Sequence, residues 1–133
     1  MKYVGKYGEY RVLACLLEQN VEIYPAIKTN QPDFDLTAIP ASGKIVRIQV
    51  KTTELSNKST NNAIKCIDKQ YDFLVIVIVD KNKTRFFVMT KSEALAAKGD
   101  GKLLSTTKQQ KKESQVKDIL LPYEDKWEKI VNA

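Results

Sequence analysis

The stretch from residue 73 to residue 79 is apolar without a break, and most of its residues are β-branched. Unbroken apolar character is typical of a strand covered on both faces of a sheet, because a solvent-facing side would show polar residues in alternation. The run is far shorter than the roughly 18 apolar residues of a membrane-spanning helix. Residues 71–79 therefore predict the central strand of a buried sheet, and no membrane span or membrane partner is expected.

Upstream of this strand, the sequence predicts one helix and three shorter strands. Residues 3–19 carry an apolar stripe at helical spacing, and Asn20 is suited to end the helix. Residues 21–25 and 34–39 are short β-prone segments bounded by prolines. Residues 44–51 alternate apolar and polar side chains with the period of two that is typical of a half-buried strand.

Downstream of the central strand, the sequence predicts a hairpin and a short helix. Residues 81–83 form a turn signal that leads into a further strand at residues 84–89. Thr90 and Glu93 make a capping-box pattern, which marks the start of a helix. That helix is expected to end before Gly99, because glycine suits the position after the last helical turn.

The last third of the chain gives weaker signals. Residues 102–117 are polar and rich in lysine, which is typical of a solvated face or a flexible loop. Pro122 suits the first turn of a helix, and Trp127, Ile130 and Val131 follow it at helical spacing. These patterns predict a closing amphipathic helix.

The chain contains no histidine, so the commonest general base and the favoured zinc ligand are both missing. The two cysteines, Cys15 and Cys66, are too few and too far apart to indicate a zinc site or a disulfide framework, and we expect buried, reduced thiols. Catalysis must then use carboxylates, amides, lysines or hydroxyls. A metal, if used, must be a hard cation bound through oxygen, such as Mg²⁺, Mn²⁺ or Ca²⁺.

The net charge is +6, from 22 Lys and Arg against 16 Asp and Glu, which favours a polyanionic partner. The length of 133 residues predicts one domain over residues 1–133. Near the N-terminus, Lys2 and Lys6 interrupt any apolar core of the length that a signal peptide needs. We therefore expect a cytoplasmic protein.

Three oxygen donors and a lysine come together in the predicted hairpin of residues 34–51. Gln49 and Lys51 share one face of the last strand because they are two positions apart. Asp35 offers a carboxylate from the neighbouring strand, and Val50 can add its carbonyl oxygen. Such a set could bind a hard cation, while Lys51 holds water or stabilises a charged phosphate. Alternatively, Gln49 and Lys51 merely cover the solvent face of an amphipathic strand.

Glu9 lies on the apolar side of the first predicted helix, because Val12, Leu13 and Leu16 follow it at helical spacing. A carboxylate directed toward a core needs a partner, since an unpaired buried charge is costly. That partner could be the site on the predicted hairpin, or it could be Arg47 in a structural salt bridge.

The succession of Gly8-Glu9 on a helix, Asp35-Leu36 on a strand and Arg47-Ile48-Gln49-Val50-Lys51-Thr52-Thr53 on the next strand resembles the PD-(D/E)XK nuclease superfamily. The chain looks most like bacterial proteins similar to group I intron homing endonucleases, and more distantly like archaeal Holliday-junction resolvases. The resemblance implies an α/β (α+β) restriction-endonuclease-like fold, in which helices flank a mixed central β-sheet.

By this resemblance, Glu9, Asp35, Gln49 and Lys51 are the catalytic residues of a Mg²⁺-dependent DNA endonuclease, with Mn²⁺ as a substitute metal. The metal would be held by Asp35, Gln49 and the backbone carbonyl of Val50. A homodimer or larger homo-oligomer is a further hypothesis, because a chain with one site needs two copies to cut both strands in one binding event.

Two features leave alternatives at the metal site. Most members of the superfamily have Glu or Asp where this chain has Gln49, and a neutral amide attracts a divalent cation less strongly. Asp33 shares strand parity with Asp35 and follows a proline, so it is an alternative metal ligand. We favour Asp35, because a carboxylate inside a strand is better fixed than one beside proline.

Residues 52–62 are rich in Ser, Thr and Asn and predict a loop that leaves the strand next to the site, where substrate could bind. The expected nucleic-acid contacts are Arg47, Thr52, Thr53 and Lys58. A nuclease-like fold with little or no activity, used to bind DNA or a protein, is the alternative function. A structural domain, with its charge serving solubility, is a third.

Overall fold

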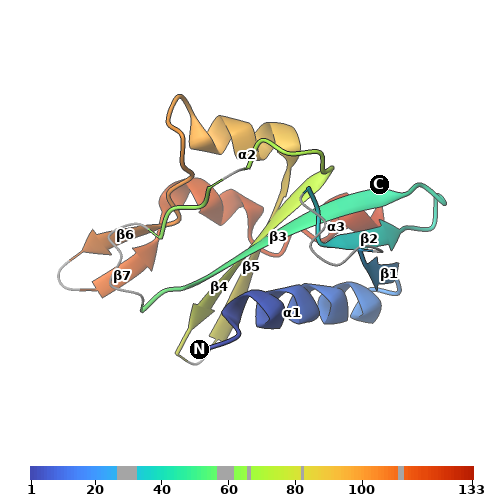
Figure 1. Cartoon of the computed structure of the whole chain (residues 1–133), viewed down its shortest axis with the longest axis horizontal. Helices are drawn as coiled ribbons and strands as arrows, with labels where there is room; N and C mark the ends of the chain where they lie inside the picture. Colours follow the sequence, from blue (N-terminus) through green and yellow to red (C-terminus); the bar gives the residue numbers. More distant parts are fainter. Residues whose placement is uncertain (27–32, 57–61, 66, 82, 111–112) are drawn as a thin grey trace.

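The computed structural model describes residues 1–26, 33–56, 62–65, 67–81, 83–110 and 113–133 (Figure 1). Lys58 and Cys66 lie outside these residues, so the expectations for them concern positions that the structure does not describe. Within the described ranges, no helix is long and apolar enough to cross a membrane.

A five-stranded mixed sheet forms the centre of the fold, in the order β1-β2-β3-β4-β5. β3 and β4 are parallel, and every other neighbouring pair in this sheet is antiparallel. The strands are β1 (Glu22–Pro25), β2 (Leu36–Ile39), β3 (Val46–Glu54), β4 (Phe73–Asp80) and β5 (Lys83–Thr90).

Helices flank this sheet on both faces, and a separate hairpin projects at one end (Figure 1). The helical elements are α1 (Val4–Glu18), α2 (Lys91–Lys98), the 3₁₀ helix η1 (Asp118–Tyr123) and α3 (Glu128–Val131). The hairpin consists of β6 (Thr107–Gln110) and β7 (Glu113–Val116).

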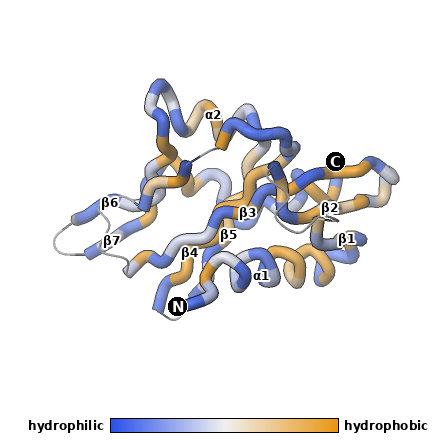
Figure 2. The backbone as a smooth tube through the Cα atoms, in the orientation of Figure 1, coloured by the Kyte–Doolittle hydropathy of each residue, from blue (hydrophilic) through white to orange (hydrophobic). Residues whose placement is uncertain are grey.

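β4 is buried on both faces, as its unbroken apolar sequence predicted, and it lies between β3 and β5 rather than in the middle of the sheet. Alternate side chains enter two separate cores, one beneath α1 and α3 and one beneath α2 and η1. Figure 2 shows the apolar character concentrated along the central strands. The residues of β4 in the first core are Phe73, Val75 and Val77, and those in the second are Leu74, Ile76 and Ile78.

α1 packs unusually close to β3. Val12 and Leu16 of α1 are fully buried, as the apolar stripe of the helix predicted. At Gly8, a Cβ atom would lie 1.8 Å from Oγ1 of Thr52 on β3. Only glycine permits this approach, so α1 is held tightly against the end of β3 where the candidate site lies.

The capping box at the start of α2 is confirmed. The Thr90 hydroxyl accepts a hydrogen bond from the Glu93 N–H at 3.1 Å, and the Thr90 N–H donates to Glu93 Oε1 at 2.9 Å. Glu93 also pairs with Lys129 Nζ at 2.8 Å, which ties α2 to α3. The capping carboxylate thus connects α2 to α3 as well as starting α2.

Of the two expectations for residues 102–117, the flexible loop is wrong for the strands found there, whereas Glu113 and Gln115 are exposed as on a solvated face. Part of this segment pairs as the antiparallel β6–β7 hairpin. Thr107 and Val116 form its innermost pair and are 1% and 6% exposed. The strands are stabilised by burial at this end, so polar composition alone did not reveal them.

The closing helix is also shorter than predicted. Pro122 lies inside the 3₁₀ helix η1, and α3 contains only four residues. Asp125, between them, has a φ of +54°, a left-handed conformation that interrupts a right-handed helix. The apolar positions were nevertheless correct in part, because Trp127 and Ile130 are buried in the core beneath α1.

β3 extends further than the predicted strand of residues 44–51. Thr52, Thr53 and Glu54 continue the parallel register with β4, opposite Val77 to Val79. The predicted loop of residues 52–62 therefore begins later.

Cys15 is a free, half-buried thiol whose pKa burial raises above its ordinary value.

Candidate active site

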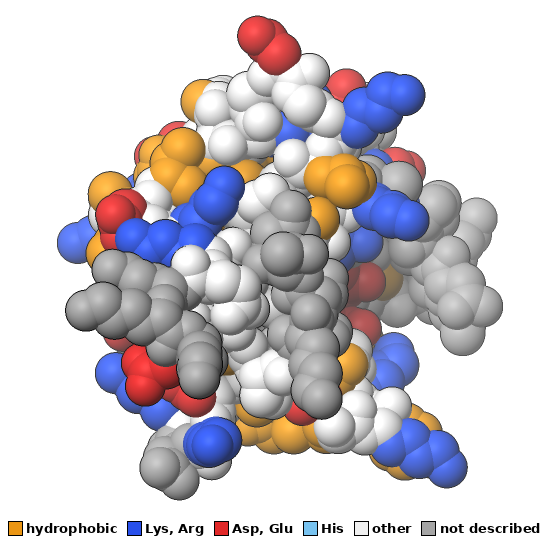
Figure 3. Space-filling view, turned by 90° about the vertical axis from the view of Figure 1, so that its left-hand side faces the viewer, with side chains coloured by type: hydrophobic (Ala, Val, Ile, Leu, Met, Phe, Trp, Pro, Cys, Tyr) orange, Lys and Arg blue, Asp and Glu red, His pale blue; other side chains and the backbone are white. Residues whose placement is uncertain are grey.

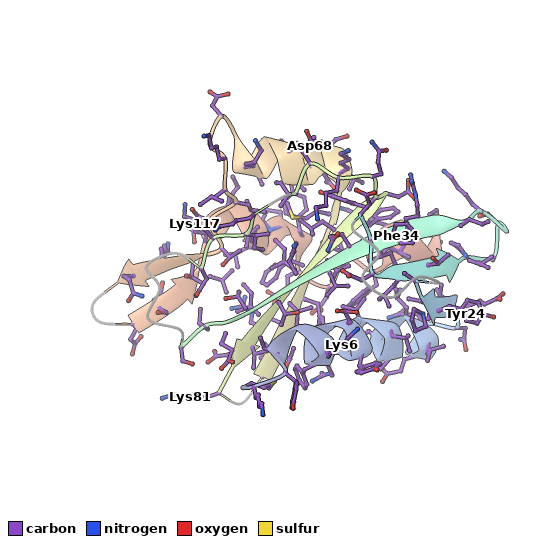
Figure 4. All side chains as sticks on the ribbon, in the orientation of Figure 1. Lys6, Tyr24, Phe34, Asp68, Lys81 and Lys117 are labelled. Atoms are coloured by element: carbon purple, nitrogen blue, oxygen red, sulfur yellow. The ribbon has the colours of Figure 1, made fainter. Side chains whose placement is uncertain are left out.

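The candidate site lies where β2 and β3 separate. The pairing of these strands ends at Leu36 opposite Ile48, and the Asp35 N–H donates to the Ile48 carbonyl at 2.8 Å. Beyond this point, no strand among the described residues pairs with that edge of β3. The result is a fork, which we define as Asp35 together with Gln49 and Val50 of β3. Phe34, the neighbour of Asp35, lies beside β3 in Figure 4.

Asp35 closes the fork with two short hydrogen bonds to one oxygen. Its Oδ2 accepts from the Val50 N–H at 2.8 Å and from Gln49 Nε2 at 2.8 Å. The carboxylate thus takes the position of a missing neighbouring strand and satisfies a backbone donor at the open edge. Its orientation is fixed by two groups of β3.

Opposing effects act on the pKa of Asp35. Burial raises the pKa of this carboxyl above its ordinary value, while the Val50 hydrogen bond and the charges of Lys51, Lys6 and Lys69 lower it. Burial is the largest of these effects. A carboxylate that loses hydration in this way gains stability from a nearby cation.

Gln49 is 5% exposed and has an unsatisfied oxygen. Its Nε2 donates to Asp35, and approaches the Val50 carbonyl at 3.5 Å. Its Oε1 is buried and makes no hydrogen bond in the part of the chain that the structure describes. A buried polar atom without a partner costs on the order of 1–3 kcal/mol, so this oxygen is available to a ligand.

Glu9 on α1 supplies a second carboxylate. Burial raises its pKa first and the charge of Asp35 raises it further, so the two carboxylates interact electrostatically. Lys6 Nζ lies 3.4 Å from Glu9 Oε1 and opposes this shift. The alternative salt bridge to Arg47 does not form, because the Arg47 Nε pairs with Asp72 Oδ2 at 3.4 Å.

Lys51 follows on the same face of β3 as Gln49 and contributes to the positive charge around Asp35. It also lines a polar cavity at the end of the strand, next to Thr52 and Thr53. Figure 3 views the molecule from the end where β6 and β7 lie, and both acidic and basic side chains are present on this face.

The structure separates the other candidates clearly. Asp33 accepts a hydrogen bond from the Gln70 N–H at 3.4 Å. Arg47 is engaged with Asp72 at the start of β3. Asp35 bonds to Gln49 and Val50, whereas Asp33 bonds to Gln70.

The four predicted nucleic-acid contacts do not form one group. Thr52 and Thr53 line the cavity beside Lys51. The Thr52 hydroxyl is buried against Gly8 and has no hydrogen-bond partner among the described residues, so its role includes packing. Arg47 is at the far end of β3, and Lys58 lies outside the described residues.

The sequence reasoning missed two lysines, Lys6 and Lys69. Lys6 is three positions before Glu9, a spacing that places two side chains on the same helical face and could have indicated the pair. In Figure 4, Lys6 projects from α1 in the direction of β3. Lys69 precedes β4 in an irregular segment, where no periodicity could have linked it to Asp35.

The donor set fits a hard cation with few protein ligands. The described residues hold no group of three or more His, Cys, Asp and Glu side chains that could bind a metal. The fork offers instead the Asp35 carboxylate, the unsatisfied Gln49 oxygen and the Val50 carbonyl, with Glu9 nearby. Mg²⁺ commonly uses one or two carboxylates and keeps several waters or phosphate oxygens, so these residues are compatible with it.

Comparisons with known proteins support the fold. No protein-family profile matches the sequence, and no curated protein matches it. Among solved structures, the chain is similar to a bacterial homing endonuclease, I-Ssp6803I, with a TM-score of 0.69 and 17% sequence identity. The alignment covers 99% of this chain and 91% of that chain. The mixed sheet with flanking helices therefore has a nuclease-like fold, as the sequence predicted.

Proposed function

We propose that the chain is a metal-dependent DNA endonuclease of the PD-(D/E)XK type, which hydrolyses phosphodiester bonds at the fork. The observation that carries this proposal is the arrangement of Asp35, Gln49 and Val50 around one carboxylate oxygen. The solved structure with the same fold is described as a homing endonuclease, which supports the same reaction class. The net charge of +6 suits a nucleic-acid partner.

In this proposal, Asp35, Gln49 and the Val50 carbonyl hold Mg²⁺ or Mn²⁺. When bound, the ion supplies positive charge that neutralises the phosphate in the transition state. Lys51 donates a hydrogen bond to the attacking water or to a phosphate oxygen. Glu9 approaches from α1 and orients water by accepting a hydrogen bond.

The nuclease proposal predicts distinct effects of Asp35→Ala and Lys51→Ala. Both substitutions should reduce nicking of supercoiled plasmid on the order of 100-fold or more, because each removes a group at the reacting phosphate. Only Asp35→Ala should also weaken Mn²⁺ binding in isothermal titration calorimetry. Lys44→Ala, in the exposed turn before β3, is the matched control and should retain nicking.

If the Asp35 and Lys51 variants cut as well as the natural protein and bind Mn²⁺ equally, the assigned site is wrong. If the natural protein binds DNA but does not cut it with either metal, the alternative of a binding module is favoured. One observation supports that alternative: Gln49 donates to Asp35 through its nitrogen, so the fork is partly satisfied by internal hydrogen bonds.

A further inference from the structure

A cavity of about 260 Å³ lies beside the fork, at the end of β3. One part of its lining comes from β3 and the other from the connection that leads toward β4. The lining residues are Lys51, Thr52, Thr53, Asn62, Ala63, Ile64 and Lys65.

Asn62 fixes the connection to the rest of the fold. It has a φ of +44°, a conformation that asparagine tolerates better than most residues, and it is 5% exposed. Its Nδ2 donates to the Glu54 carbonyl at 3.3 Å and to Thr107 Oγ1 at 3.2 Å. Its own carbonyl accepts from Thr106 Oγ1 at 2.9 Å. The segment is thereby attached both to β3 and to the start of the β6–β7 hairpin.

A second attachment follows two residues later. Ile64 and Leu104 form an isolated antiparallel bridge, with N–H to carbonyl distances of 2.8 and 3.0 Å. Both side chains are buried, at 6% and 1% exposed. Lys65 therefore follows a fixed residue, and this wall of the cavity is held by backbone bonds and core packing.

The chemistry of the cavity favours an anion. Lys51 and Lys65 contribute two ammonium groups, and the described residues that line the cavity include no carboxylate. Lys65 is exposed and forms no ion pair with any residue in the ranges that the structure describes. Among the described residues, no aromatic side chain lines the cavity, so these residues offer no surface on which a base could stack.

We propose that this cavity binds a backbone phosphate of the nucleic-acid strand, adjacent to the phosphate at the fork, and that Lys65 is the residue that contacts it. The proposal rests on the proposed function, because Lys51, which follows Val50 of the fork and is assigned to the reacting phosphate there, also lines the cavity. Asn62 acts as a positioning residue, which holds the segment that carries Lys65. The contact is to phosphate, so it is independent of base sequence.

The test is the salt dependence of DNA binding by Lys65→Ala. Binding of a fluorescein-labelled duplex is measured by fluorescence anisotropy in EDTA, over a range of NaCl concentrations. Loss of one phosphate contact should reduce the slope of log K against log salt by about 1 and affect unrelated duplex sequences equally. We expect affinity at low salt to fall about tenfold, the range of a hydrogen bond to a charged group.

Two further variants control for charge and folding. Lys44→Ala removes the same charge from an exposed turn away from the cavity and should leave the slope unchanged. Lys65→Arg keeps the charge and should retain most of the binding. Because Lys65 is exposed, Lys65→Ala should unfold at the natural protein's temperature in circular dichroism. A parallel series with single-stranded DNA of the same sequence identifies the form of strand that engages Lys65.

An unchanged slope and affinity in Lys65→Ala on both forms of DNA would overturn the proposal, as would an equal loss in Lys44→Ala. Absence of DNA binding by the natural protein at low salt would also overturn it. The outcomes separate this inference from the proposed function. If the natural protein cleaves DNA but Lys65→Ala has an unchanged salt dependence, only the phosphate site in the cavity is refuted. If Lys65→Ala has a reduced salt dependence but the natural protein does not cleave DNA, only the catalytic assignment is refuted.

Discussion

Under the proposed function, catalytic competence would depend on Gln49. Its side chain provides one buried, unpaired oxygen and one nitrogen that donates to Asp35. An amide attracts a divalent cation less than a carboxylate does, because it carries no net charge. Gln49 is buried and bonds to Asp35, so its side chain does not face solvent. The alternation of polar and apolar residues in the sequence could not distinguish this buried position from a solvent-exposed one.

Gln49→Glu should strengthen Mg²⁺ binding and alter the metal dependence of cleavage. The substitution adds a charge beside the Asp35 carboxylate, and a bound cation offsets the resulting repulsion. Calorimetry with Mg²⁺ and a plasmid-nicking titration with Mg²⁺ and Mn²⁺ measure the two effects. Activity that appears only in the variant would identify the natural chain as a binding module, and unchanged metal affinity would contradict the assignment of Gln49 as a ligand.

Gly8→Ala tests the close packing of α1 on β3. The new Cβ would lie 1.8 Å from Thr52 Oγ1, so the helix or the strand must move. Overpacking of this kind costs roughly 1–3 kcal/mol of unfolding free energy, measurable by urea denaturation. Gly5→Ala on the same helix is the control, because nothing lies within 4 Å of a Cβ there, and it should be neutral or slightly stabilising.

If Gly8→Ala is as stable as Gly5→Ala, the close contact does not exist in solution. The double variant Gly8→Ala with Thr52→Ala should recover part of the loss, since it removes the hydroxyl that the new carbon meets. Recovery in the double variant would locate the strain at this one contact rather than in a general change of helix propensity.

At the scale of elements, local patterns predicted some parts well and missed others. Periodicity predicted α1 and β4, and the capping box predicted the start of α2. Both kinds of pattern depend on residues that are neighbours in the sequence. The β6–β7 hairpin was missed, because its burial depends on partners far away in the sequence, such as Asn62 beside Thr107. Patterns within the hairpin carry no information about these contacts.

The Arg85–Glu124 pair joins β5 to the end of η1 and should make stability depend on pH. Arg85 donates to both Glu124 oxygens, from Nε at 2.8 Å and from the guanidinium NH2 group at 2.9 Å. These hydrogen bonds lower the pKa of Glu124, although burial opposes them. Because the folded pKa is lowered, the contribution is present above the unfolded value and disappears as the pH falls through the folded value.

Glu124→Gln should therefore reduce the unfolding free energy by about 1 kcal/mol at pH 7, with the partial exposure of the pair limiting its strength. The difference from the natural protein should shrink as the pH falls through the lowered pKa of Glu124, where this side chain itself becomes neutral. Urea denaturation at pH 7, 5 and 3 measures this. A difference that stays constant across the range would mean that the ion pair contributes nothing and that packing accounts for the loss.

At the scale of the whole molecule, a buried sheet followed from one apolar strand, and the fold class followed from the resemblance that a short series of motifs carries. The arrangement of the site did not, because α1 and the segment before β4 approach Asp35 from separate parts of the chain. The period of two along the strand predicted that Gln49 and Lys51 share one face. Only the assembled sheet shows that β2 ends beside Val50, so that Asp35 can accept a hydrogen bond from the Val50 N–H.

The proposed cleavage reaction has a consequence for assembly. Each chain contains one fork, so cutting both strands of a duplex in one binding event requires two copies. We expect multi-angle light scattering to show a species of at least twice the mass of one chain when DNA is bound. Linear plasmid should then appear together with nicked plasmid. A single chain on DNA with nicked circles as the sole product would support a monomeric nickase.

The short β2 leaves part of the β3 edge without a neighbouring strand among the described residues, and exposed sheet edges can pair with other chains and aggregate. Asp35 accepts the hydrogen bond of the Val50 N–H at this edge and places a charge where another strand would have to approach. The same carboxylate that is proposed to bind metal thus protects the sheet from intermolecular pairing. An Asp35→Ala preparation therefore needs to be checked for self-association before its inactivity is attributed to chemistry.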